Sequence, residues 1–148
     1  MRDRFKASVS VFAIVRRNDR VLMLLRSGTG WMDGYWSLPA GAMDGGEVAS
    51  VAAARELREE VSLVAASGAL ALAHTQQNFT HGDEWLGLYF EASDVTGSPA
   101  VIEPEKHAAV EWFAVDTLPA NTVPYVRLAL EAIQDGDLFS TYADARTS

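Results

Sequence analysis

One segment without glycine or proline constrains this chain more than any other. Residues 47–61 are rich in alanine, glutamate and arginine, and this composition predicts a helix. Apolar runs with strand character lie on both sides of the segment. A long helix between strands predicts an α+β fold, built as a sandwich around a mixed β-sheet.

Three carboxylates of this segment fall close together on the predicted helix. Glu56, Glu59 and Glu60 stand at positions i, i+3 and i+4, so they project from one face within a turn. The expected apolar face of this helix consists of Val51, Ala54, Leu57 and Val61, and it points elsewhere, toward the expected core. Like charges at this spacing destabilise a helix by about 0.2–0.5 kcal/mol a pair. Two interpretations remain open, which are a metal site and a solvated helix face with Glu/Arg pairs.

A hard divalent cation would turn this repulsion into attraction. Mg²⁺ prefers oxygen ligands and is usually held by one or two carboxylates together with substrate phosphates. The glycine-rich turn that starts near Gly41 lets the backbone approach such a metal or a phosphate closely. Arg55 can pair with Glu59 or with Glu47 and so orient the carboxylates. We therefore expect Mg²⁺ as the cofactor, with Mn²⁺ as a second possibility.

The rest of the chain supplies strands and a second helix. Strands are predicted at residues 8–15, 21–25, 70–79, 85–92 and 109–115. The dipeptide Asn18-Asp19 predicts a hairpin turn between the first two strands. A final helix should run from near Pro124 to Gln134, and residues 141–148 should form a frayed tail. We expect one domain over residues 1–148.

Composition and charge exclude several classes of protein. The chain has no cysteine, which excludes disulfides, thiolate catalysis and Cys-ligated metals. Its net charge of −8 argues against binding a nucleic-acid duplex. No apolar run approaches the ~18–20 residues of a membrane span, so no membrane partner is expected. The apolar run 7–15 superficially resembles a signal peptide, but Arg16-Arg17 follows it without a cleavage pattern. We predict a core strand there and a cytoplasmic protein.

The pattern from Gly41 to Leu63 resembles the Nudix box, written G-x5-E-x7-R-E-U-x-E-E-x-G-U with U aliphatic. The matching identities are Gly41, Glu47, Arg55, Glu56, Leu57, Glu59, Glu60 and Leu63. Residues 36–41 also look like the family's approach to the box. Ser62 departs from the pattern, because the family has glycine there. If that position is a left-handed helix C-cap, a non-glycine residue costs about 1–2 kcal/mol.

The resemblance implies a Nudix-type α/β/α sandwich that hydrolyses a nucleoside diphosphate linked to another moiety. It implies metal-assisted attack of water on a phosphorus of the diphosphate bridge. The metal ligands it implies are Glu56, Glu59 and Glu60 together with Gly41, and the orienting pair is Glu47 and Arg55.

The general base is left open by the resemblance. It is Glu56 or a carboxylate outside the box, for which the candidates are Glu103 and Glu105. We favour Glu103 slightly, and the alternative for either residue is a solvated loop charge.

Aromatic residues offer a stacking wall for a nucleotide base. The candidates are Trp31, Tyr35, Phe79 and Trp85, and packing at the core or its rim is the competing interpretation for each. Trp36, Trp112 and Phe113 are predicted to be core residues. The three histidines His74, His81 and His107 lack the spacing of a metal site.

The substrate follows only by elimination. Family signatures for ADP-ribose, diadenosine polyphosphates and coenzyme A are not recognisable, which favours a nucleoside triphosphate or a modified nucleotide. Two other classes stay open, a nucleotide-binding regulatory module of the same fold without turnover and an interaction domain whose acidic helix is surface decoration. A homodimer is possible.

Overall fold

The computed structural model describes residues 2–144. Its strands are β1 (Ser8–Arg17), β2 (Arg20–Arg26), β3 (Trp36–Ser37), β4 (Ala40–Ala42), β5 (Val64–Ala65), β6 (Leu70–Thr80), β7 (Asp83–Ala92), β8 (Val95–Thr96), β9 (His107–Ala114) and β10 (Phe139–Ala143). Its helices are α1 (Ala49–Val61), α2 (Pro124–Gln134) and the short 3₁₀ helix η1 (Val115–Thr117). No helix among residues 2–144 is long and apolar enough to cross a membrane.

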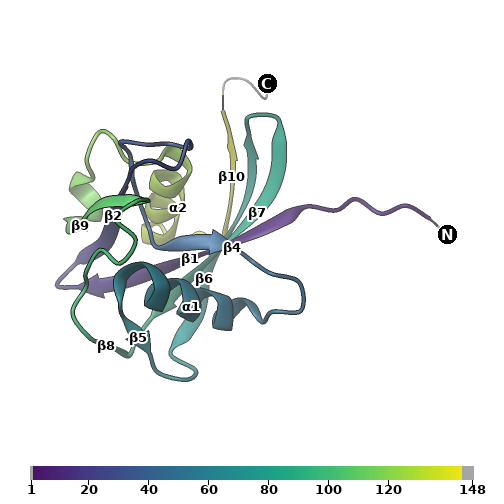
Figure 1. Cartoon of the computed structure of the whole chain (residues 1–148). Coiled ribbons are helices and arrows are strands. Elements are labelled where there is room, and N and C mark those ends of the chain that lie inside the picture. Colours follow the sequence, from purple (N-terminus) through teal and green to yellow (C-terminus); the bar gives the residue numbers. More distant parts are fainter. Residues whose placement is uncertain (1, 145–148) are drawn as a thin grey trace.

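Strand β1 organises a mixed sheet, as the sequence predicted. It pairs in parallel with β7, from Ser8 opposite Trp85 to Val15 opposite Ala92, and antiparallel with β4. The sheet order is β10-β6-β7-β1-β2-β3, with β4 beside β1 and β9 beside β2. The two helices α1 and α2 lie on opposite sides of β1 (Figure 1). This is the predicted α/β/α sandwich.

The alternation of side chains along β1 separates the two halves of the core. Phe12 and Ile14 pack into the cluster that contains α2 residues such as Val126. Ala13 and Val15, one residue further on, pack into the cluster that contains Leu57 of α1, and Val11 joins a third cluster with α1 alanines. One face of β1 therefore packs against α1 and the opposite face packs against α2.

Two hairpin turns fix the register of the long strands. Asn18 and Asp19 have φ values of 49° and 66°, as the turn predicted there requires. His81 and Gly82 between β6 and β7 also have positive φ, 54° and 82°. Two successive left-handed residues match the twist of antiparallel strands, so these two-residue turns set the pairing directly.

Helix α1 begins two residues later than predicted and presents a different face to the sheet. Its buried residues are Ala52, Ala53, Glu56, Leu57, Glu60 and Val61. Val51, which the sequence placed on the apolar face, is 59% exposed. The helix is turned in this way because two of its carboxylates, not Val51, fill the space above β4. Helix α2 matches its predicted bounds, with Pro124 in its first turn.

The chain end differs from the expected frayed tail. Residues 139–143 form β10, which pairs in parallel with β6 from Thr75 to Phe79. The amide of Asp144 continues the pairing by donating to the carbonyl of Phe79. The expectation was wrong here because strand pairing with a distant segment leaves no local signal. The remainder of that predicted tail, residues 145–148, lies outside the described residues.

Replacing Ser62 by glycine should stabilise the fold. Ser62 caps α1 in the left-handed region, with φ 62° and ψ 29°, and its amide donates to the carbonyl of Arg58. Glycine removes the steric cost of this conformation, so Ser62→Gly should add about 1 kcal/mol and raise Tm by about 2–4 °C in calorimetry. Ser62→Ala keeps the cost and should melt close to wild type. An unchanged or lower Tm for Ser62→Gly would contradict this account of the helix end.

Candidate functional site

Two glutamates of α1 point into the protein rather than into solvent. Glu56 and Glu60 are 9% and 7% exposed. A Cβ at Gly41 would overlap the carboxylate of Glu56, so only glycine leaves room for it. The amide of Ala40 donates to Oε2 of Glu60 over 3.0 Å. The solvated-face interpretation is therefore wrong for these two residues, whereas the Glu59 side chain is half exposed at the rim.

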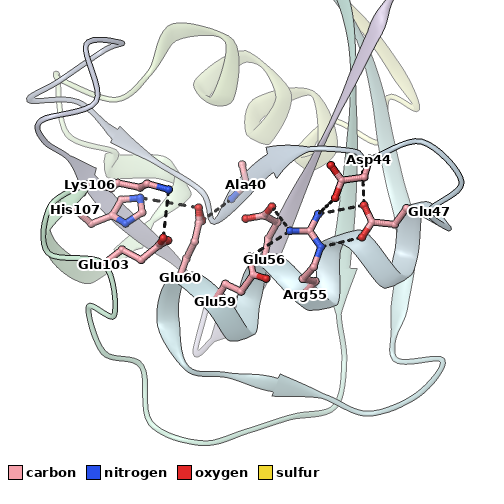
Figure 2. Close-up of polar contacts among 10 residues, drawn as sticks. All are labelled: Ala40, Asp44, Glu47, Arg55, Glu56, Glu59, Glu60, Glu103, Lys106 and His107. Carbon is pink, nitrogen blue, oxygen red and sulfur yellow. Dashed lines mark hydrogen bonds and ion pairs between the residues drawn. The ribbon is translucent and has the colours of Figure 1, made fainter.

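Arg55 holds the carboxylates of the helix in a fixed arrangement (Figure 2). Its Nε and Nη2 donate to the two oxygens of Glu47 over 2.8 and 3.1 Å. Its Nη1 donates to Glu56 over 3.0 Å and to Glu59 over 3.2 Å. The hydrogen bonds from Arg55 hold the pKa of Glu47 below its usual value. Both pairings of Arg55 expected from the sequence are present, and one guanidinium makes them together.

The buried carboxylates lack full compensation within the protein. Burial raises the pKa of Glu60 to about 8, although the amide of Ala40 acts in the opposite direction. Burial also raises the pKa of Glu56, and Arg55 offsets this only in part. A carboxylate that is costly to ionise without a counter-charge is suited to a divalent cation, which supplies that charge.

These carboxylates open into a cavity of about 390 Å³, here called the acidic cavity. The residues that line it are Arg26, Thr29, Ala40, Gly41, Glu56, Glu59, Glu60, Glu103, Lys106 and His107. Glu103 approaches from the loop before β9, and its carboxylate lies 3.3 Å from Nζ of Lys106. Glu105 is exposed and is not among the lining residues. Of the two candidates from this loop, Glu103 alone reaches the cavity.

The donor set fits Mg²⁺ in one particular way. Within residues 2–144, no three Asp, Glu or His side chains are gathered closely enough to hold a metal by themselves. Mg²⁺ is commonly bound by one or two carboxylates, with waters and substrate phosphates completing its shell. The inward carboxylates of Glu56 and Glu60 beside an open cavity meet this requirement.

A second cavity of about 350 Å³, here called the aromatic cavity, adjoins the first. Its lining residues are Ser8, Ser10, Phe12, Arg26, Trp31, Ser37, Ala40, Gly41, Thr80, Asp83, Trp85 and Tyr125. The two cavities share Arg26, Ala40 and Gly41. A ligand can therefore extend from the aromatic cavity past Arg26 to the carboxylates.

The predicted aromatic residues divide into two groups. Trp31 and Trp85 line the aromatic cavity, whereas Tyr35 and Phe79 are not among its lining residues. Phe79 precedes Thr80 on β6, and neighbouring residues of a strand face opposite sides of the sheet. Tyr35 is 38% exposed in the loop before β3.

Hydrogen bonds hold Trp31 at the cavity. Its Nε1 donates to the hydroxyl of Tyr125 over 3.2 Å, and its carbonyl accepts from Nε of Arg26 over 2.7 Å. Asp33 closes the same loop by accepting from the amides of Thr29 and Gly30. The ring edge of Trp85 lies against Tyr125, with centroids 5.2 Å apart. The aromatic wall is thus assembled from a loop, a strand and a helix.

Several lining residues were missed by the sequence interpretation. Arg26 and Lys106 bring positive charge to the acidic cavity, and Phe12 and Tyr125 line the aromatic one. Arg26 ends a strand next to the glycine-rich loop, which was a usable signal. The others gave none, because their place depends on distant strand pairing. His107, expected only as a polar residue, is buried with Nε2 4.0 Å from Glu60, and burial lowers its pKa.

Comparisons with known proteins agree with this geometry. The family model of the NUDIX domain matches residues 4–132. The putative nudix hydrolase 1 of Caenorhabditis elegans is 29% identical over 130 residues, which are 82% of this chain and 34% of that protein. The putative 8-oxo-dGTP diphosphatase of Bacillus subtilis is 30% identical over 101 residues, 68% of this chain and 64% of that protein. The chain therefore spans about a third and just under two-thirds of these relatives.

Solved structures show the same fold. The MutT NUDIX hydrolase of Burkholderia pseudomallei superposes with a TM-score of 0.78 at 30% identity, covering 86% of this chain and 98% of that one. The MutT protein of Methanosarcina mazei Go1 has a TM-score of 0.73 at 21% identity, covering 87% of this chain and 94% of that one. The second likeness concerns the fold alone.

Glu60→Gln should stabilise the metal-free protein, increasingly so as pH rises. The folded-state pKa of Glu60 is raised from 4.5 to about 8, so between these values the unfolded chain loses this proton first and wild-type stability falls. Glutamine cannot ionise, and its advantage should grow from pH 5 to pH 8, reaching roughly 3 kcal/mol. Denaturant titrations in EDTA measure the difference. The exposed Glu131→Gln is the control, and a difference independent of pH would contradict the prediction.

Proposed function

We propose that this chain, which belongs to the Nudix family, hydrolyses the diphosphate bridge of a nucleoside triphosphate or modified nucleotide in a metal-dependent reaction. The observation that carries the proposal is the continuity of the two cavities at Arg26, Ala40 and Gly41. One cavity offers aromatic rings to a base and the other offers carboxylates to a metal. A nucleotide polyphosphate is the class of small molecule that needs both at once.

In this proposal Glu56, Glu59 and Glu60 hold Mg²⁺ or Mn²⁺, with the backbone at Gly41 beside them. A metal held there would neutralise phosphate charge and lower the pKa of the attacking water. Arg55 and Glu47 take no part in binding the substrate. They fix the directions of Glu56 and Glu59 through the hydrogen bonds of one guanidinium.

Phosphate groups would lie between the two cavities. Arg26 borders both cavities and Lys106 borders the acidic one, so each can place positive charge beside the diphosphate bridge. Nζ of Lys106 also lies 3.3 Å from the carboxylate of Glu103, which lines the same cavity. These two residues extend the site beyond the box.

The proton of the attacking water needs an acceptor close to the phosphates. Glu56 and Glu103 both line the acidic cavity and remain the two candidates. Glu103 is favoured, because a carboxylate used to hold the metal is a poorer proton acceptor. Glu105 is left as a solvated loop charge.

The choice of nucleotide rests on the aromatic cavity and on one relative. Trp31 and Trp85 supply rings on which a base can stack, in a cavity of about 350 Å³. The 30% identical relative from Bacillus subtilis is named an 8-oxo-dGTP diphosphatase, which is a nucleoside triphosphate activity. The aromatic cavity supports a substrate that contains a base, and the relative favours a nucleoside triphosphate over a nucleotide sugar or a dinucleotide.

The test is Mg²⁺-dependent phosphate release, coupled to a phosphatase, over a panel of nucleoside triphosphates, nucleotide sugars and dinucleotides. Wild type should turn over a triphosphate only with the metal. The double variant Glu59→Gln/Glu60→Gln should lose about 100-fold or more in kcat, because charge stabilisation of the transition state is lost. Gly41→Ala should also lose activity, since its methyl group displaces the Glu56 carboxylate.

Glu131→Gln on the outer face of α2 is the matched control and should keep wild-type rates. No turnover across the panel, with a nucleotide still raising Tm, would replace the hydrolase by a regulatory module that only binds. No effect of metal or nucleotide on rate or Tm would favour an interaction domain.

A further inference from the structure

Strand β6 carries four buried polar side chains on one face, where a packed layer usually has apolar ones. His74, Gln76, Asn78 and Thr80 are 1%, 0%, 0% and 3% exposed. They alternate along the strand, so all four lie on one face of β6, where Gln76 bonds to α2 and His74 to β10. The last of them, Thr80, lines the aromatic cavity. The row therefore connects the interior to the proposed base site.

The donor and acceptor directions in this row are fixed at its centre by a backbone carbonyl. Nε2 of Gln76 donates to the carbonyl of Tyr125 over 2.9 Å. A carbonyl only accepts, so the amide nitrogen of Gln76 must face α2 and its Oε1 must face the other way. Oε1 accepts from the hydroxyl of Tyr89 and from Nδ2 of Asn78, each over 3.3 Å.

The orientation of Gln76 also determines which hydrogen-bonding role the Thr80 hydroxyl takes. Because Nδ2 of Asn78 donates to Gln76, Oδ1 of Asn78 faces Thr80 and accepts the hydroxyl proton of Thr80. The hydroxyl has only one proton, and this bond uses it. Toward the aromatic cavity, Thr80 can therefore offer lone pairs alone.

The other end of the row enforces the same directions. Nδ1 of His74 lies 2.9 Å from the carbonyl of Asp137 and must donate to it. Nε2 of His74 lies 2.7 Å from Oγ of Ser140. Oγ of Ser140 is left to accept from Nε2 of Gln76 over 3.3 Å. The backbone carbonyls of Tyr125 and Asp137 thus fix which atoms donate at Gln76 and at His74.

A second acceptor lies beside Thr80 at the cavity. Asp83 is the cross-strand partner of Thr80 and also lines the aromatic cavity. A carboxylate accepts hydrogen bonds and donates none. The serine hydroxyls of the same lining can each donate or accept a hydrogen bond. Thr80 and Asp83, in contrast, can only accept.

We propose that Thr80 and Asp83 form an acceptor-only edge that selects nucleotide bases with two neighbouring N–H donor groups, as on the N1–H and 2-amino edge of guanine, and that Asn78 and Gln76 are positioning residues for it. The proposal rests on the proposed function, because it assigns the base of that substrate to the aromatic cavity. A base carbonyl that faced Thr80 would oppose its buried lone pairs, and one that faced the exposed Asp83 would meet a negative charge, so both arrangements are unfavourable.

The experiment compares GMP with IMP, which differ only in the 2-amino group, by isothermal titration of the intact chain. Neither contains an anhydride bond, so the result does not depend on turnover, which the phosphate-release screen measures separately. IMP should bind about tenfold or more weakly than GMP, because without the 2-amino group one of the two acceptors has no hydrogen-bond donor. Thr80→Val and Asp83→Asn should each reduce this ratio to about threefold or less.

Two variants of Asn78 separate positioning from packing. Asn78→Asp still accepts from Thr80 and should keep the GMP preference, whereas Asn78→Leu frees the Thr80 hydroxyl and should lose it. Both remove the donor to Gln76, so an effect that came from losing this hydrogen bond alone would appear in both variants. Glu84→Gln removes a charge next to Asp83 on the opposite face of β7 and should leave the ratio unchanged. Equal affinities for GMP and IMP in wild type, or no binding of either, would overturn the proposal.

Discussion

The structure depends on two buried carboxylates of helix α1, which lie against strand β4. This strand consists only of alanine and glycine. Glu56 faces Gly41 of β4, where a larger residue would exclude it, and Glu60 accepts a hydrogen bond from the amide of Ala40. Burial makes both groups costly to ionise, and this cost is only partly offset, by Arg55 at Glu56 and by the amide of Ala40 at Glu60. An arrangement selected for stability alone would place apolar side chains here. In the proposed function, a divalent cation from outside the chain would supply the missing positive charge, so stability and function would oppose each other at this site.

The same contact sets the position of the rest of the site. Strand β4 pairs with β1, so the strand that carries Gly41 to the carboxylates also borders the face that carries Phe12 to the aromatic cavity. Arg26 at the end of β2 lies where the cavities join. On the far side of the aromatic cavity, the polar row on β6 holds α2 and β10 in place through Tyr125 and Ser140. In the proposed base site, the hydrogen bonds that hold α2 and β10 in place would also set the acceptor edge.

Local patterns predicted what depends on local physics. The absence of glycine and proline located α1, and Pro124 located the first turn of α2. The dipeptide Asn18-Asp19 located a hairpin turn, and both residues have positive φ in the structure. The residue spacing also identified the carboxylates of α1. The prediction of which face of α1 is buried was less accurate. The acidic positions and the apolar positions repeat with the same helical period, and Val51 fits that period as well as the residues that are buried.

Contacts between distant segments could not be predicted from one sequence. Phe79 and Thr80 are neighbours, yet only Thr80 lines the aromatic cavity, and a single step in strand register decides which one does. Tyr125 reaches the cavity because α2 packs on β6, a placement that no motif marks. Strand β10 forms by pairing with β6 across more than fifty residues of chain. These features follow from the topology of the sheet.

Anomalous diffraction from crystals soaked in Mn²⁺ and a non-hydrolysable nucleoside triphosphate tests the central claim most directly. The account predicts a metal peak in the acidic cavity, within ligand distance of carboxylate oxygens of Glu56 or Glu60 and of a phosphate oxygen. The base should lie in the aromatic cavity of the same molecule. A nucleotide bound without a metal peak at these carboxylates, or a metal bound only elsewhere, would contradict the account.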